Sequence, residues 1–130
     1  MLGDDDAVVE PLVADLAQKT HEEIRAFEDI LASKLHQLDT EAHAREIGDG
    51  AYGAGYFSVD WFLYARCAVV ASGRATYETV RNNPSAFPRD REFEALLNVA
   101  SDAYERKTGE TFDYTPTVSY ETFSNRAGWP

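Results

Sequence analysis

Cysteine and basic residues are scarce in this 130-residue chain. The single cysteine, Cys67, excludes an internal disulfide and a zinc site built from several cysteines. Twelve Lys and Arg residues stand against 23 Asp and Glu residues, which gives a net charge of -11. Nucleic acids and anionic lipids are bound mainly through basic side chains, so neither is an expected partner. A basic protein, a cation or a small ligand remains compatible with this charge.

Long apolar runs and a secretory signal are also missing. The first residues, 1–6, are acidic and lack the positive and apolar regions of a signal peptide. No apolar stretch reaches the roughly 20 residues that a transmembrane helix needs. We therefore expect a cytoplasmic protein. Its 44% hydrophobic and 12% aromatic content is typical of one globular domain with a packed core.

Helix-start signals predict an all-α fold. Thr20 and Glu23 have the spacing of a capping box, and apolar residues then recur every three or four positions through 24–38. The acidic residues of that stretch, including Glu28, are interpreted as a solvated face. Ser58 is a good N-cap for a helix over 59–72 that is apolar around most of its circumference. This helix is expected to be the buried centre of the fold, with Cys67 as a core residue.

The remaining boundaries are read from proline, glycine and capping residues. A first helix over 7–19 contains Pro11, so it should start late or bend. Residues 40–47 either extend the preceding helix or form a short new one. A short helix over 74–82 stops before Pro84.

Asp90 can cap a long final helix that ends at Lys107. Gly109 is expected to follow this helix in a left-handed conformation, and Gly73 is expected to end the central helix in the same way. Four glycines within 48–55 predict an irregular connection before that central helix.

Together these patterns predict a compact bundle of about five helices with a glycine-rich connection and an irregular C-terminal tail. Residues 1–19 form an acidic segment and first helix, 20–110 the helical core, and 111–130 the tail. The tail lacks a stable apolar period, and aromatic side chains are expected to dock it. The candidates for docking are Phe112, Tyr114, Tyr120, Phe123 and Trp129.

Matching residues in segment 58–74 carry a family resemblance. The positions that match in register are Asp60, Phe62, Arg66, Gly73 and Arg74. The segment resembles the signature of the bacterial "domain of unknown function 4240" family, Ser-Asp-Asp-x-Phe-x-x-Phe-Arg-x-Trp-Leu-Ile-x-x-Gly-Arg in outline, and the likeness extends over about 20–110. It implies an all-helical domain with a functional face and no assigned reaction. Three positions depart from the signature: Val59, Ala65 and Ala68 replace its first Asp, second Phe and Trp.

Asp60, Arg66 and Arg74 are the main polar residues of that segment. Asp60 and Arg66 are six positions apart, about 600° of helical rotation, so a direct ion pair between them is not expected. In one interpretation Asp60 stabilises its helix start, and the arginines bind carboxylates or carbonyls of neighbouring segments. In the other, the arginines bind a carboxylate or phosphate ligand beside aromatic side chains. Those aromatic candidates are Tyr56, Trp61, Tyr64 and Tyr77.

Aromatic residues also gather around the glycine-rich connection, and they form either a wall of the core or a contact patch for a partner. The group comprises Tyr52, Tyr56, Phe57, Trp61 and Tyr64.

His36, Asp39 and His43 would share one helical face if the helix persisted through residue 40. Imidazole and carboxylate groups are suitable zinc ligands. However, the two histidines would be about 10.5 Å apart along the axis, too far for one ion to reach both easily. A solvated polar face is the simpler interpretation, and no metal is assigned.

These observations favour a non-enzymatic interaction or accessory protein that binds a protein or peptide partner, preferably a basic one, through an acidic surface bearing Tyr and Trp. An immunity or neutralising role fits the size and charge. No cofactor is expected, and no catalytic residue is assigned. The alternative is a small-molecule or metal-dependent enzyme, or a ligand-binding domain, with an aromatic pocket containing Asp60, Arg66 and Arg74. Neither the partner nor the oligomeric state follows from the sequence.

Overall fold

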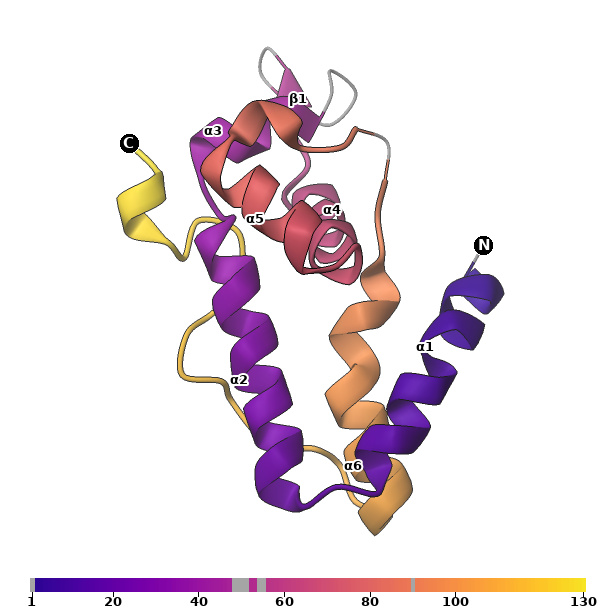
Figure 1. The fold of residues 1–130 in the computed structure, drawn as a ribbon. Coiled ribbons are helices and arrows are strands. Elements are labelled where there is room, and N and C mark those ends of the chain that lie inside the picture. The colour runs from indigo at the N-terminus through magenta and orange to yellow at the C-terminus, as the bar shows by residue number, and fades with distance from the viewer. Residues whose placement is uncertain (1, 48–51, 54–55, 90) are drawn as a thin grey trace.

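The computed structural model describes residues 2–47, 52–53, 56–89 and 91–130. Within these ranges the fold is all-α, with six α-helices and several short 3-10 turns (Figure 1). The α-helices are α1 (Leu2–Ala17), α2 (His21–Gln37), α3 (Glu41–Ala44), α4 (Val59–Ala71), α5 (Arg74–Asn82) and α6 (Val99–Thr108). The 3-10 turns are η1 (Arg45–Ile47), η2 (Pro84–Ala86), η3 (Glu94–Asn98) and η4 (Arg126–Gly128). The predicted all-helical class is confirmed.

Helix α2 begins at the predicted capping box. The Glu23 backbone N–H donates to Thr20 Oγ1 at 3.1 Å, and the Thr20 backbone N–H donates to Glu23 Oε1 at 3.0 Å. These reciprocal bonds satisfy donors that a helix start leaves free. Beyond α2, the chain starts the separate helix α3, with the Thr40 side chain as its N-cap.

Helix α1 runs through Pro11 and begins at Leu2, so the expectation of a late start is wrong. Val9, Val13 and Leu16 are buried, and α1 packs along α6. This apolar face is continuous on both sides of Pro11. Its burial offsets the backbone hydrogen bond that proline cannot donate, because tertiary packing supplies most helix stability in proteins.

Helix α4 is the buried centre of the molecule, as predicted. Its start is capped by Ser58 Oγ, which accepts the Trp61 backbone N–H at 3.2 Å. One side of α4 contributes Leu63 and Cys67 to an apolar cluster with α1, α2 and α6. Another side contributes Phe62 and Val69 to a second cluster with α3, η1 and α5. Helix α4 therefore joins two cores, which explains its apolar circumference.

The predicted single helix from Asp90 to Lys107 begins later than expected. Asp90 lies outside the described residues, and the helical path starts as η3 and becomes α6 at Val99. The reason is a tertiary hydrogen bond, because the Phe93 backbone N–H donates to the Tyr64 carbonyl at 3.0 Å. That bond holds the chain extended against α4 before the first helical turn.

The two predicted glycine conformations differ. Gly109 follows α6 in a left-handed conformation with φ 75°, as predicted. Gly73 also has a positive φ of 102°, but its ψ of 171° is outside the left-handed helical region. It serves as the N-cap of α5, and the backbone of Ser72 caps α4 in its place. The connection between the two helices therefore consists of two residues, Ser72 and Gly73.

The glycine-rich connection contains two short strands, β1 (Tyr52–Gly53) and β2 (Tyr56–Phe57), paired antiparallel. The sequence did not predict them, and the rest of the connection lies outside the described residues. The tail beyond Gly109 is irregular apart from η4, as predicted, and runs beside α2 (Figure 1).

Aromatic side chains dock this tail, as expected. Phe112 and Tyr120 contact the first core, and Trp129 contacts the second.

Candidate functional site

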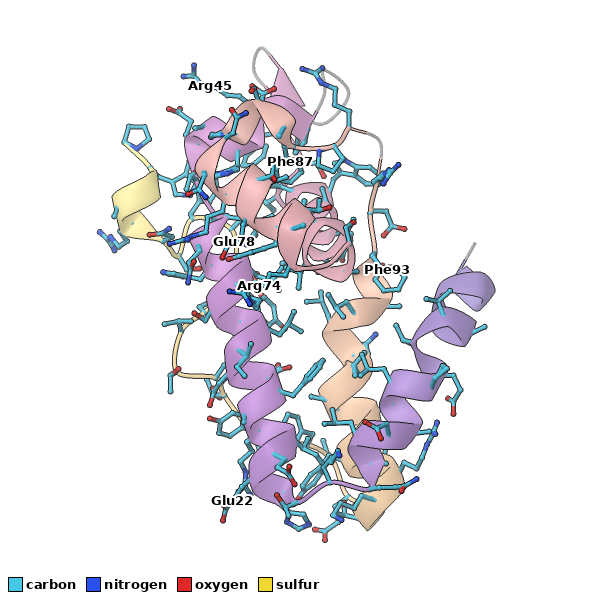
Figure 2. The ribbon with its side chains drawn as sticks, viewed as in Figure 1. Glu22, Arg45, Arg74, Glu78, Phe87 and Phe93 are labelled. Atoms are coloured by element: carbon cyan, nitrogen blue, oxygen red, sulfur yellow. The ribbon has the colours of Figure 1, made fainter. Side chains whose placement is uncertain are left out.

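The predicted site residues occupy different environments. Arg66 and Tyr77 are buried, whereas Asp60, in the first turn of α4, is exposed. Arg74, at the start of α5, is also exposed (Figure 2). Trp61 and Tyr64 are half-buried on α4. Tyr56 belongs to β2, and its side chain lies outside the described part of the structure. Arg66 and Arg74 therefore do not share one solvent-accessible environment.

Arg66 binds three segments inside the protein. Its Nη1 donates to the Leu35 carbonyl at 2.9 Å and to the Tyr120 carbonyl at 3.0 Å, and its Nη2 donates to Thr122 Oγ1 at 3.1 Å. The guanidinium also lies 4.6 Å from the centre of the Phe62 ring. Arg66 therefore joins α4, the end of α2 and the tail, which agrees with the interpretation that it binds free carbonyls.

Burial lowers the pKa of Arg66 to about 10, although the charge of Asp39 opposes this shift. A guanidinium with this pKa stays charged at neutral pH. A buried charge is tolerated only when hydrogen bonds and opposite charges surround it. The bonds to α2 and the tail therefore stabilise the ionised form of Arg66, while its Nε has no hydrogen-bond partner among the described residues.

Asp39 has a docking role that the sequence did not reveal. Its carboxylate is fully buried and accepts the backbone N–H of Phe123 at 3.1 Å and of Asn125 at 2.9 Å. It also accepts the indole N–H of Trp129 at 3.0 Å. One carboxylate therefore collects three donors from the tail. Its position directly after α2 gave no signal of this role, because all three partners are distant in sequence.

His36 and His43, the other residues of the metal hypothesis, bind separate partners. His43 Nε2 lies 2.8 Å from the Val80 carbonyl, and its Nδ1 lies 2.6 Å from Thr40 Oγ1. His36 Nδ1 lies 2.9 Å from the Ser119 carbonyl. In the described ranges no three His, Cys, Asp or Glu side chains are placed to hold a metal ion. Burial, the largest effect, lowers the pKa of His43, which favours a neutral imidazole.

Tyr77 and Cys67 belong to the interior. The Tyr77 hydroxyl donates to the Lys34 carbonyl at 2.9 Å, so α5 is attached to α2. Burial raises the pKa of Tyr77 to about 12 and that of the Cys67 thiol also to about 12. A thiol with so high a pKa is a poor nucleophile at neutral pH, which fits the predicted core role of Cys67.

An acidic surface surrounds the start of α4. Burial raises the pKa of Tyr64, and the nearby carboxylates of Glu94 and Asp60 raise it further. The tail passes the same helix start, because Thr122 Oγ1 donates to the Val59 carbonyl at 3.0 Å. This brings the exposed carboxylate of Glu121 to the same region. We call this surface the acidic α4 face and define it as Val59, Asp60, Tyr64, Glu94, Glu121 and Phe123.

Phe123 has an unusual backbone on this face. Its φ is 78°, in the left-handed region that bulky residues rarely adopt, and its side chain is 50% exposed. The bond from its backbone N–H to Asp39 holds this conformation, and its ring contacts Phe57 and Trp129 edge-on. A strained residue that presents an aromatic ring to solvent is typical of a functional surface.

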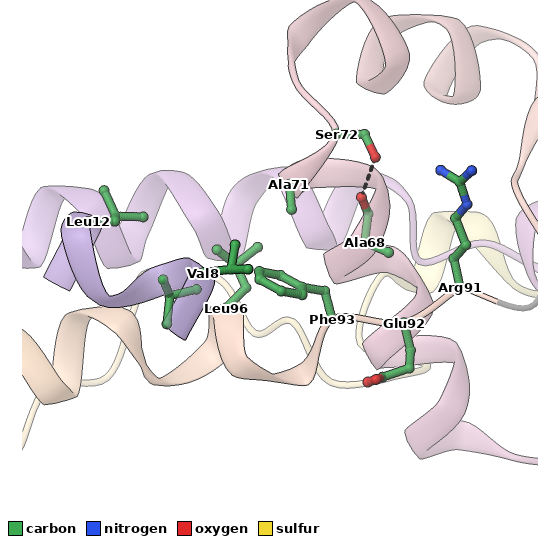
Figure 3. A pocket seen from close by; sticks show the side chains of 10 residues that line it. Val8, Leu12, Ala68, Ala71, Ser72, Arg91, Glu92, Phe93 and Leu96 are labelled. Atoms are coloured by element: carbon green, nitrogen blue, oxygen red, sulfur yellow. Dashed lines mark hydrogen bonds between the residues drawn. The ribbon is translucent and has the colours of Figure 1, made fainter. Parts of the chain in front are cut away.

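A separate apolar groove lies between α1, the end of α4 and η3 (Figure 3). It has a volume of about 660 Å³, and its apolar lining includes Val8, Leu12 and Phe93. Arg91 extends away from these apolar side chains at one end (Figure 3). None of the predicted site residues lines this groove.

Glu28 departs from the sequence interpretation. It was expected on a solvated face, but its side chain is buried. The signal was present in the spacing, since Glu28 follows Ile24 by four positions and precedes Leu31 by three, within the apolar stripe of α2.

No helix in the described part of the chain is both long and apolar enough to cross a membrane.

Comparisons with known proteins identify a family without an assigned activity. A family model described as a protein of unknown function (DUF4240) matches residues 2–106. No curated protein and no solved structure matches the chain. The matched region includes all of α1 to α5 and most of α6, and the tail residues that bind Arg66 and Asp39 lie beyond it. The chain belongs to the DUF4240 family of proteins of unknown function.

Proposed function

We propose that this protein is a non-enzymatic interaction protein that binds a basic protein or peptide partner through the acidic α4 face. The observation that carries the proposal is the composition of that face. It combines the exposed carboxylates of Asp60 and Glu121 and the half-buried carboxylate of Glu94 with two exposed apolar side chains, Val59 and Phe123. Apolar anchors bordered by charged groups are typical of protein interfaces.

The net charge of -11 supports a basic partner. A protein with this charge attracts cationic surfaces over several ångströms and repels anionic ones, so it accelerates encounter with a basic partner. An immunity or neutralising role in a bacterial cytoplasm, in which the face covers a basic toxin, is the form of the proposal that suits the size and charge of the chain.

The rival ligand-binding or enzyme hypothesis requires Arg66 and Arg74 to hold one anion. Both terminal nitrogens of Arg66 already donate to Leu35, Tyr120 and Thr122. An anionic ligand would have to replace these internal bonds. The interaction proposal needs no such rearrangement, because its carboxylates are already on the outside.

The proposal is tested by neutralising the face. A triple variant, Asp60→Asn, Glu94→Gln and Glu121→Gln, is compared with a control triple, Asp15→Asn, Glu22→Gln and Glu105→Gln. Both remove three negative charges, but the control positions are exposed on α1, α2 and α6. Partners captured from lysate at low and high salt are quantified by mass spectrometry. We expect a basic partner that the wild type and the control triple retain, that the face triple loses, and that high salt releases.

Equal retention by both triples, or capture that does not depend on salt, would contradict the proposal. Phe123→Gly supplies an independent readout. Glycine adopts a positive φ without strain, which offsets part of the stability lost with the ring contacts to Phe57 and Trp129, and thermal unfolding confirms that the variant is folded. It removes the exposed ring, and we expect partner affinity to fall by roughly tenfold. Unchanged affinity for that same partner would exclude Phe123 as an anchor.

A further inference from the structure

A second, smaller cavity lies between α2 and the tail. It has a volume of about 220 Å³. Glu28 lines it from α2, and its other lining residues belong to the tail: Tyr114, Thr115, Pro116, Val118, Ser119, Tyr120 and Glu121. Glu121 also belongs to the acidic α4 face, so this cavity opens beside the proposed interface. We call it the Glu28 crevice.

Hydrogen bonds hold the tail in place over the crevice. The Tyr114 hydroxyl donates to Asp29 Oδ2 at 2.7 Å, and the Thr117 backbone N–H donates to Asp29 Oδ1 at 3.1 Å. Farther along, the Ser119 carbonyl lies 2.9 Å from His36 Nδ1. The tail is thus attached to α2 at Asp29, next to Glu28, and at His36, about two turns farther along the helix. Asp29 makes the bonds to the tail that Glu28 does not make.

Glu28 is a buried carboxylate without a hydrogen-bond partner in the part of the chain that the structure describes. Its side chain is 8% exposed, and its Oε1 has no hydrogen-bond donor among the described residues. Burial raises its pKa, and the neighbouring charge of Asp29 raises it further. Buried polar atoms are almost always hydrogen-bonded, so an unsatisfied one indicates a missing partner or a functional constraint. For a carboxylate, the partner that would restore the ionised form is a cation.

The volume of the crevice and the accessibility of its carboxylate oxygens favour one kind of cation. Small-molecule sites usually measure about 300–1,000 Å³, so a cavity of about 220 Å³ suits one side chain better than a whole ligand. Because Oε1 is closed to solvent, a cation in the crevice would contact the carboxylate through Oε2 and compensate the charge that the two oxygens share. A guanidinium binds a carboxylate best through both oxygens, so this geometry does not suit it. An ammonium is a compact point charge on a slender stem and does not need both oxygens.

We propose that the Glu28 crevice is a lysine anchor, which receives the side-chain ammonium of one lysine of the basic partner. This inference rests on the proposed function, because the lysine belongs to the proposed basic partner. Its ammonium would enter the protein beside the acidic α4 face. Glu28 supplies the buried carboxylate, Glu121 adds a second negative charge at the cavity wall, and the tail supplies the remaining lining.

The test uses small probes and does not require the partner. Nα-acetyl-lysine amide is titrated into the ¹⁵N-labelled full chain, and amide shifts are followed by NMR. Nα-acetyl-norleucine amide is the control without the ammonium, and Nα-acetyl-arginine amide tests the choice of cation. We expect saturable shifts at Glu28 and at residues 114–121 with the lysine probe, and weaker binding of the arginine probe. The norleucine probe should cause no saturable shift.

Glu28→Gln should remove these shifts, whereas Glu22→Gln, an exposed position on the same helix, should keep them. Glu28→Gln should still fold, because glutamine is neutral and similar in size. Its thermal unfolding is measured to confirm this. Shifts that persist in Glu28→Gln, equal shifts with norleucine, equal affinity for arginine, or no response to lysine would each overturn the lysine anchor.

The outcome also separates this inference from the proposed function. If lysine fails to bind while partner capture still depends on the acidic α4 face, only the lysine anchor is wrong. If the lysine probe binds at the crevice but no partner depends on the face, the anchor stands and the proposed function is wrong.

Discussion

Arg66 and Asp39 are both fully buried, and each binds the tail through its own hydrogen bonds. Arg66 binds the tail at Tyr120 and Thr122, while Asp39 binds it at Phe123 and beyond. The two opposite charges therefore stabilise successive parts of one segment, and each reduces the cost of burying the other. Both residues make structural bonds, which was one of the two interpretations of Arg66. Asp39 was expected on a solvated polar face, and its burial shows that this expectation is wrong.

Replacing Arg66 should destabilise the protein strongly. In Arg66→Met the apolar stem remains, but the carbonyls of Leu35 and Tyr120 lose a donor and Asp39 loses a compensating charge. We expect a loss of about 3–5 kcal/mol in the free energy of unfolding, measured by urea denaturation. Arg74→Met is the matched control at an exposed position and should change stability by about 0.5 kcal/mol or less. Similar losses in both variants would contradict this assignment.

Replacing Glu28 should have the opposite effect. Because burial raises its pKa, the folded protein favours the protonated carboxyl, and stability falls as the pH rises through the folded pKa. The neighbouring charge of Asp29 is negative and raises the pKa in the same direction as burial. We expect Glu28→Gln to be more stable than the wild type by about 1–3 kcal/mol at pH near 7.

Urea denaturation over a pH series tests this expectation. Below the ordinary pKa of a glutamate, about 4.3, the wild-type carboxyl is protonated in both states, so the difference from Glu28→Gln should shrink. A difference that stays constant with pH would show that ionisation of Glu28 is not its cause.

At the scale of elements, the packing of η4 depends on the close approach of Gly128 to Asp39 and Thr40. A Cβ atom on Gly128 would lie 2.7 Å from the Asp39 carbonyl oxygen and 2.8 Å from Thr40 Cγ2. The first of these neighbours is backbone and cannot move without displacing the end of α2. Gly128 therefore allows η4 to pack against the connection between α2 and α3.

Gly128→Ala should consequently release η4. We expect a cost of about 1–3 kcal/mol for tail docking and a change in Trp129 fluorescence as its indole N–H leaves Asp39. The measurement is made in a Trp61→Phe background, so that Trp129 is the only tryptophan. Ala127→Ser, at the exposed neighbouring position, should leave the spectrum unchanged. An unaltered spectrum in Gly128→Ala would contradict the close-packing argument.

The elements differ in how far the sequence predicted them. The starts of α2 and α4 were predictable because each cap involves residues three positions apart, Thr20 with Glu23 and Ser58 with Trp61. The candidate site was not, because its bonds are long-range. Asp39 and Asn125 are separated by 86 positions, and no local pattern indicates such a pair. Only the burial of Glu28 had a local signal, in the apolar spacing of α2.

At the scale of the whole molecule, two apolar cores meet at α4 within a strongly acidic surface. The net charge of -11 means that exposed carboxylates repel one another more than the few surface ion pairs attract. We expect added sodium chloride to raise the melting temperature up to about 0.2 M, because screening weakens this repulsion. Differential scanning calorimetry measures the effect. A melting temperature that falls with salt would show that attractive pairs dominate.

The docking of the tail by Arg66 and Asp39 has a consequence for synthesis of the protein. The N-terminus of a chain leaves the ribosome first, so Asp39 and Arg66 emerge well before residues 120–129, which supply most of their partners. Until those residues leave the exit tunnel, folding would enclose two incompletely satisfied charges. The helices of the nascent chain therefore cannot reach their full stability before residues 120–129 have left the exit tunnel.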